Sequence, residues 1–238
     1  MTQTSKPVIA YHKNCIASED SKCQDCDLDG LLLCRFDKQF ARKFMLGNTA
    51  YRILAIGIFV LSGLHIGHWW MLPTYVGILL LTFFVIEPRL LCSHCPYYEL
   101  EGKYLKCWAL RGMPKIWKYR PEPISKWEKY LMLVFGIYID LFPFVGLIWG
   151  IVEFARNPVE TLNLGIGMSV VGGLFIIVAI IFAQVLLGRN CKQCANFSCG
   201  MNKAPPEIAV KFLEKNPKIK EAWEKAGWKP TISNEENK

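Results

Sequence analysis

The fold is decided by residues 162–187, LNLGIGMSVVGGLFIIVAIIFAQVLL, in which only Asn163 and Gln184 are strongly polar. A helix needs about 20 mostly apolar residues to cross the hydrocarbon core, because every backbone N–H and C=O must be paired inside lipid. This run therefore predicts a transmembrane helix. The composition agrees, since the 238 residues are 52% hydrophobic and only 20% charged, which excludes a disordered chain and disfavours an ordinary soluble domain.

Three more apolar runs precede it, at residues 53–70 (ILAIGIFVLSGLHIGHWW), 72–86 and 130–154. A tight turn joins the first two runs, and a short loop joins the last two. The sequence therefore predicts an all-α integral membrane protein with four transmembrane helices, arranged as two hairpins at residues 52–88 and 130–188. Glycines within residues 165–173 predict close helix packing, because small residues let backbones approach.

The basic residues predict the orientation of these helices. Of the 28 lysines and arginines, eight lie in residues 1–52, nine in residues 89–129 and ten from residue 189 onward, which leaves only Arg156 for the opposite side. The positive-inside bias then places both termini and the middle loop in the cytoplasm, in a protein of the cytoplasmic membrane. The first 50 residues are polar, so no cleavable signal peptide is expected. Anionic lipid headgroups account for the charge of +8, and no nucleic-acid partner is expected.

All ten cysteines lie in the three basic segments, 1–51, 89–129 and 189–230. Each segment carries one C-x-x-C pair followed by a third cysteine, namely Cys23, Cys26 and Cys34, then Cys92, Cys95 and Cys107, then Cys191, Cys194 and Cys199. Cys15 is an extra candidate ligand. In a reducing cytoplasm such cysteines favour metal ligands or redox groups over disulfides. A C-x-x-C turn supplies half a tetrahedral shell, so these segments are predicted to bind metal.

Two of the motifs resemble each other. RLLCSHCPY begins at Arg89, GRNCKQCANF begins at Gly188, and each directly follows the second helix of a predicted hairpin. The two motifs begin 99 residues apart, and Trp127 and Trp223, each followed by Glu-Lys, are 96 residues apart. These matches favour a tandem repeat, in which Cys92 and Cys95 face Cys191 and Cys194. The N-terminal cysteines would then recruit Cys107 or Cys199.

The number and identity of the metal centres stay open. Ten cysteines fill two four-thiolate sites with two to spare, and adding His12 and His94 gives enough ligands for three sites. Four-sulfur environments suit an iron–sulfur cluster, of the 4Fe–4S type, or Zn²⁺ as the alternative. Neither the bacterial nor the plant-type ferredoxin spacing is present.

Few ionisable groups lie within the apolar runs. His65 and His68 have no facing histidine, which disfavours a haem with two histidine ligands, and HIGHWW suits an interfacial belt. His65 and Asp140 are candidates for a quinone site, because ionisable groups inside a membrane often mark a pathway.

The cytoplasmic segments contain local helix signals. Ser125 and Glu128 form a predicted capping box before the third membrane helix. Pro206 and Pro217 predict starts of two tail helices. Their apolar side is predicted to pack on the cysteine region or on a partner, through Ile208, Phe212, Leu213, Ile219 and Trp223. Residues 231–238 are polar and are predicted to form a disordered end.

Two functions follow from these patterns. The first is a membrane electron-transfer subunit, an oxidoreductase component whose cytoplasmic iron–sulfur clusters exchange electrons between a soluble donor and a membrane quinone or partner subunits. The alternative is a zinc-stabilised structural anchor or assembly protein without redox activity.

Overall fold

The computed structural model describes residues 13–18 and 25–228, and this part of the chain forms helices and no strand. The predictions for Cys23, His12 and residues 231–238 lie outside the described residues. Four helices are long and apolar enough to cross a membrane: Lys38–Ile66, Met71–His94, Lys126–Arg156 and Leu162–Asn190. The predicted all-α chain with four membrane-length helices is confirmed. The grouping into hairpins and the tandem repeat stay predictions.

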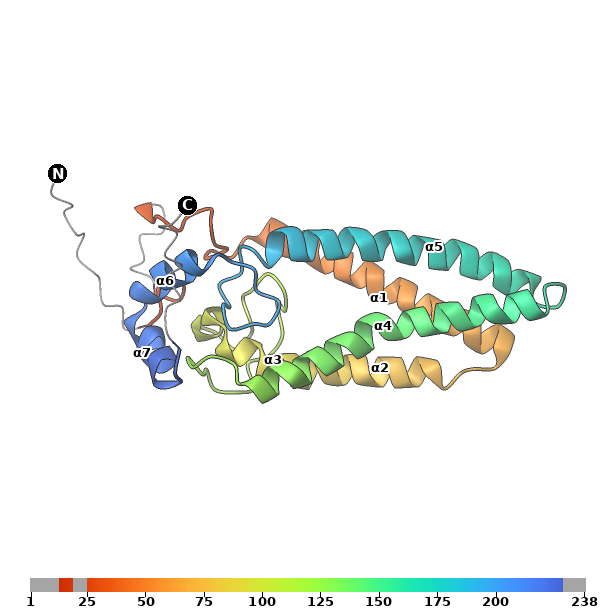
Figure 1. The fold of residues 1–238 in the computed structure, drawn as a ribbon, viewed down its shortest axis with the longest axis horizontal. Coiled ribbons are helices and arrows are strands. Elements are labelled where there is room, and N and C mark those ends of the chain that lie inside the picture. Colours follow the sequence, from red (N-terminus) through yellow and green to blue (C-terminus); the bar gives the residue numbers. More distant parts are fainter. Residues whose placement is uncertain (1–12, 19–24, 229–238) are drawn as a thin grey trace, which may run out of the picture.

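The four helices run along the long axis of the molecule, and the loops that carry the cysteines gather at one end (Figure 1). α1 (Lys38–Ile66) packs against α2 (Met71–Leu81), α4 (Lys126–Arg156) and α5 (Leu162–Val185). The short helices α6 (Pro206–Glu214) and α7 (Pro217–Lys225) lie at the same end as the loops. The links from α1 to α2 and from α4 to α5 lie at the opposite end (Figure 1).

Both helices that lead into a cysteine motif change their winding before it. α2 continues as a π-helical turn, η2 (Thr82–Ile86), then as α3 (Glu87–Leu90) and the 3₁₀ turn η3 (Cys92–His94). α5 continues as a second π-helical turn, η5 (Leu186–Asn190), which ends at Cys191. π-Turns inside helices occur frequently at functional sites.

α1 differs most from its apolar run, which predicted a start at residue 53. The helix begins at Lys38, because the Asp37 side chain caps it by accepting hydrogen bonds from the N–H groups of Gln39 and Phe40. It ends at Ile66, where Gly67 adopts a φ of 76° that favours glycine. The apolar run thus marks the part of the helix suited to lipid, and not the whole helix.

The bundle core is aromatic and closely packed. Phe59, Tyr75 and Phe175 are completely buried between the helices. At Gly165 and Gly172, a Cβ atom would collide with side chains of α4, so these two glycines confirm the predicted close packing. At Gly173 an added Cβ would meet nothing within 4 Å. The outer faces carry exposed apolar side chains, among them Leu133, Ile148, Ile166, Ile177 and Ile181, which fits contact with lipid.

The local helix signals are confirmed. Ser125 Oγ accepts a hydrogen bond from the Glu128 N–H at 3.3 Å, and the Glu128 carboxylate accepts from the Ser125 N–H at 3.0 Å. α6 and α7 begin at the predicted prolines. Phe212, Leu213, Ile219 and Trp223 bury their side chains together with Leu28 and Leu32, and Cys15, Cys26 and Cys34 pack against this cluster.

Candidate functional site

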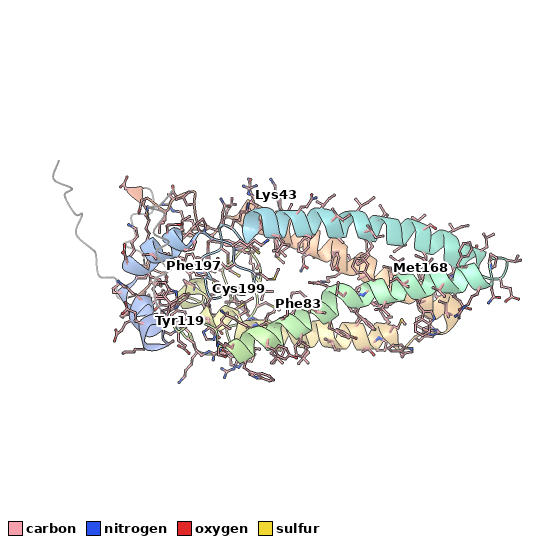
Figure 2. The ribbon with its side chains drawn as sticks, viewed as in Figure 1. Lys43, Phe83, Tyr119, Met168, Phe197 and Cys199 are labelled. Atoms are coloured by element: carbon pink, nitrogen blue, oxygen red, sulfur yellow. The ribbon has the colours of Figure 1, made fainter. Side chains whose placement is uncertain are left out.

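Six cysteines from two distant parts of the chain meet where the bundle ends. Cys95 interacts electrostatically with Cys107, Cys194 and Cys199, and Cys92 interacts with Cys95, Cys107 and Cys199. Cys194 also interacts with Cys191. Cys199 lies among the loops beyond the helices (Figure 2). We call Cys92, Cys95, Cys107, Cys191, Cys194 and Cys199 the bundle-end cysteines.

The Asn196 side chain joins the two cysteine motifs, and the Asn202 side chain braces the loop after Cys194. Asn196 Nδ2 donates to the Leu91 carbonyl at 3.2 Å, which joins the loop after Cys194 to the residue before Cys92. Asn202 Nδ2 donates to the carbonyls of Cys194 and Asn196 at 2.8 and 3.0 Å. Sequence reasoning missed Asn196 because its spacing from Leu91 does not indicate a contact, and it missed Asn202 because an asparagine in a loop has many possible local partners.

Backbone N–H groups point at four of the six sulfurs. Cys194 Sγ accepts from the Asn196 N–H at 3.5 Å, and Cys107 Sγ accepts from the Leu110 N–H at 3.2 Å. Cys95 accepts from the Tyr97 N–H, and Cys199 accepts from the N–H groups of Met201 and Asn202. Each donor lies two or three residues after its cysteine. Hydrogen bonds of this kind stabilise the charged form of an acceptor, so the loops are suited to thiolates.

The metal-free thiols are nevertheless protonated at neutral pH. Burial raises the pKa of the Cys191 thiol to about 11 and that of Cys194 to about 12. Burial also raises the pKa of Cys95, Cys107 and Cys199, and the neighbouring thiols add to this effect at Cys95. A metal that binds here must therefore displace protons, which makes its affinity dependent on pH.

The thiols are near one another without forming a coordination shell. Within residues 13–18 and 25–228, no three Cys, His, Asp or Glu side chains stand in a geometry that would hold one metal ion. The Asn190 side chain lies directly before Cys191, is completely buried, and has no hydrogen-bond partner on either amide atom among the described residues. An unpaired buried amide costs about 1–3 kcal/mol, so this polar group is suited to a further partner.

The N-terminal cysteines lie beside α6 and α7. Cys15 Sγ accepts from Asn216 Nδ2 at 3.2 Å, and both Cys15 and Cys26 interact electrostatically with Lys215. Cys34 packs against the same cluster as Cys15 and Cys26, and Tyr97 interacts electrostatically with Cys34 as well as with Cys95 and Cys107. Cys107 and Cys199 interact electrostatically with Cys92, Cys95 and Cys194, and their recruitment by the N-terminal cysteines stays a prediction.

His94 is held by groups other than the thiols. Its Nδ1 lies 2.6 Å from the Glu122 carbonyl, and its Nε2 lies 3.6 Å from a carboxylate oxygen of Glu128. These contacts tie the loop after α3 to the start of α4. The sequence offered His94 as a ligand for a third centre, and that role stays a prediction, since the buried Nε2 has no hydrogen-bond partner among the described residues.

An ion pair joins two helices of the bundle, with Arg52 largely buried and Asp140 at the surface. Arg52 of α1 meets the Asp140 carboxylate of α4 at 2.9 Å. The Arg52 guanidinium also donates to the Ile139 carbonyl at 2.8 Å. Pro143 lacks an N–H and so cannot pair with the carbonyl of Ile139 in the preceding turn, which leaves that oxygen for Arg52. The sequence did not indicate Arg52 as a membrane-embedded residue, because it precedes the apolar run. Pro143 did indicate that the Ile139 carbonyl would lack its helical partner.

The two quinone-site candidates are not brought together. His65 lies in the last turn of α1 and is exposed. It follows Arg52, the partner of Asp140, by thirteen residues of a continuous helix, or about 20 Å. Asp140 and His65 therefore lie at different depths along the axis of the bundle.

Comparisons with protein families, with curated proteins and with solved structures found no match to this chain.

Proposed function

We propose that this protein is a membrane electron-transfer subunit, whose bundle-end cysteines bind an iron–sulfur cluster of the 4Fe–4S type at the cytoplasmic end of the bundle. The observation that carries the proposal is the set of four sulfurs, on Cys95, Cys107, Cys194 and Cys199, that each accept a backbone N–H. Hydrogen bonds to sulfur are among the factors that set the reduction potential of a cluster. The cluster would supply the reversible one-electron change.

The chain's own residues support this role in three ways. The N–H groups of Tyr97, Leu110 and Asn196 stabilise thiolate charge. The buried amide of Asn190 is available to a cluster sulfide or to a thiolate. Binding would also draw the sulfurs into a shell and displace their protons, as expected for coupled binding and local folding.

The position of Glu87 supports exchange with the membrane phase. Glu87 interacts electrostatically with Arg52 and Asp140 in the bundle. It also interacts with Cys92, Cys107 and Cys199. The bundle-end cysteines and the ion pair therefore share Glu87 as a neighbour. Glu87 thus connects the cysteines with the part of the bundle that a carrier dissolved in lipid would contact. We propose a membrane quinone or a partner subunit as one redox partner and a soluble protein as the other.

We also propose that both termini and the cysteine-bearing loops face the cytoplasm, because 27 of the 28 lysines and arginines fall in the sequence segments 1–52, 89–129 and 189–238, which carry all the cysteines. Intact cells treated with a membrane-impermeant maleimide should leave all ten cysteines unmodified. Labelling of Cys107 from outside the cell would overturn this orientation, with labelling in permeabilised cells under denaturing conditions as the positive control.

The electron-transfer proposal is tested by anaerobic purification and measurement of iron, acid-labile sulfide and zinc. We expect iron and sulfide in equal amounts, visible absorption that dithionite bleaches, and reoxidation by a ubiquinone or menaquinone analogue. A colourless protein with stoichiometric zinc would contradict the proposal, because zinc has no accessible redox change.

A zinc-stabilised anchor is the second candidate, and the loop at residues 100–125 favours it. This loop forms no helix, and its one β-bridge pairs Tyr104 with Pro114. A loop with so little regular structure gains stability from metal ligation. The same metal measurement separates the two functions.

A further inference from the structure

Asp140 presents a charged group on the outer surface of the bundle. Its side chain is 57% exposed, whereas the side chain of its partner Arg52 is 12% exposed. Asp140 follows Lys126, the first residue of α4, by fourteen residues, or about 21 Å along the helix. Ile137 and Leu141 beside it are exposed and apolar. The carboxylate therefore faces lipid within the membrane and not the aqueous phase.

The protein stabilises this carboxylate from one side only. Arg52 neutralises its charge, and among the described residues Arg52 is the one side chain that forms an ion pair with it. Arg52 is itself engaged by the Ile139 carbonyl and, at 3.3 Å, by the Tyr75 hydroxyl. An ionised carboxylate has about four positions that accept hydrogen bonds. In lipid, where water is scarce, its exposed side is a strong acceptor for a donor that arrives through the membrane.

The helix leaves room beside this acceptor. Gly136 lies four residues before Asp140, so both residues lie on the same face of α4, one turn apart. A Cβ atom added at Gly136 would meet no heavy atom within 4 Å. The missing side chain at Gly136 therefore leaves open space one side chain wide next to the carboxylate, on the turn that leads toward the bundle-end cysteines, and we call this space the recess at Gly136.

We infer that Asp140 and the recess at Gly136 form a binding site for the hydroxyl group of a lipid-soluble hydroquinone. This inference rests on the proposed exchange of electrons with a membrane quinone. A hydroquinone dissolves in lipid, donates through two O–H groups and carries a flat ring that suits a recess one residue wide. The oxidised quinone has only carbonyl acceptors, which the carboxylate repels, so the site selects the reduced form.

The test uses the full-length protein, purified without oxygen into lipid nanodiscs, and calorimetric titration with a short-chain hydroquinone. The wild type is expected to bind the hydroquinone at least about tenfold more tightly than its dimethyl ether, because a hydrogen bond to a charged group contributes about 1.5–3 kcal/mol. Asp140→Asn should weaken binding by a similar factor. Gly136→Leu fills the recess without changing the charge and should also weaken binding, whereas Gly173→Leu, at another open glycine on α5, should not.

Equal binding of the hydroquinone and its ether, or unchanged affinity in Gly136→Leu, would overturn the site. Copurification of a second chain that Asp140→Asn releases would instead assign the carboxylate to a subunit interface. Metal and sulfide content are measured on the same samples. A protein that holds a redox-active cluster but binds no hydroquinone refutes this inference alone, and a zinc protein that binds hydroquinone refutes the electron-transfer function alone.

Discussion

The helical bundle and the cysteine-bearing loops at its end obtain their stability from different sources. In the bundle, backbone groups pair within each helix, and buried rings such as Phe59 and Phe175 fill the space between helices. In the loops, the Asn196 side chain connects two segments that have little regular structure, and the Asn202 side chain braces the loop that contains Cys194. The bundle therefore persists without a cofactor, whereas the loops depend on specific bonds and, in our proposal, on metal ligation.

Removal of the metal should show the largest difference in stability between the bundle and the loops. After treatment with a chelator under anaerobic conditions, we expect the helical circular-dichroism signal to remain while trypsin cuts the loop that contains Lys103, Lys106 and Arg111. The reason is that metal binding contributes folding energy to the loops alone. Limited proteolysis with mass spectrometry measures the effect. Loss of the helical signal together with the metal would show that the bundle also depends on it.

A double variant sharpens the description of the loops. Cys95→Ser and Cys194→Ser should each lose the same metal equivalent, and the double variant should lose no more, because a partial shell binds metal far less well than a complete one. Metal analysis of purified protein measures this. Independent, additive losses would show that each cysteine motif holds its own centre.

Packing between helices gives the next largest effect. Gly172→Leu should destabilise the bundle by about 3 kcal/mol, because even a Cβ at this position collides with Leu147 of α4. Gly173→Leu is the matched control, since an added Cβ there meets nothing within 4 Å. Thermal unfolding in detergent measures both. Equal effects of the two substitutions would contradict the packing described for α4 and α5.

Arg52 offers a rescue experiment within the bundle. Arg52→Met should destabilise the protein by about 2 kcal/mol, since it leaves the Ile139 carbonyl without its donor. Pro143→Ala restores an N–H to that carbonyl and should recover part of the loss. If the double variant is no more stable than Arg52→Met, then the proline does not determine the position of Arg52.

The smallest expected effect concerns the link between the N-terminal segment and α6. Hydrogen bonding to Lys215 lowers the pKa of Asp27. Its stabilising contribution is therefore present above the ordinary pKa of an aspartate and is lost as the pH falls through the lowered value. Asp27→Asn should cost less than about 1 kcal/mol at neutral pH, and this difference should shrink as the pH falls through the lowered pKa of Asp27. Chemical unfolding of both proteins across this range measures it, and an equal difference at all pH values would contradict the ion pair.

The same difference between the regions explains what could be predicted from the sequence. Long apolar runs predict membrane helices because lipid forces local backbone pairing, and the cap at Ser125 and the tail-helix starts at Pro206 and Pro217 are also local signals. Arg52 and Asn196 were missed because their roles depend on partners that only the fold brings near, and Asn190 was missed because only the fold shows that its amide is buried and unpaired. The spacing of C-x-x-C motifs indicated candidate cysteines, but grouping Cys107 and Cys199 with the C-x-x-C pairs required the path of the loops.

The central claim is that the bundle-end cysteines hold a redox-active cluster, and low-temperature paramagnetic resonance of dithionite-reduced protein tests it most directly. The wild type and Cys26→Ser should give the signal of a reduced iron–sulfur cluster, and Cys95→Ser and Cys194→Ser should lose it. Cys26 is the matched control because it lies with the N-terminal segment beside Lys215. Absence of a signal from anaerobically prepared wild type that contains stoichiometric zinc and no iron would contradict the claim.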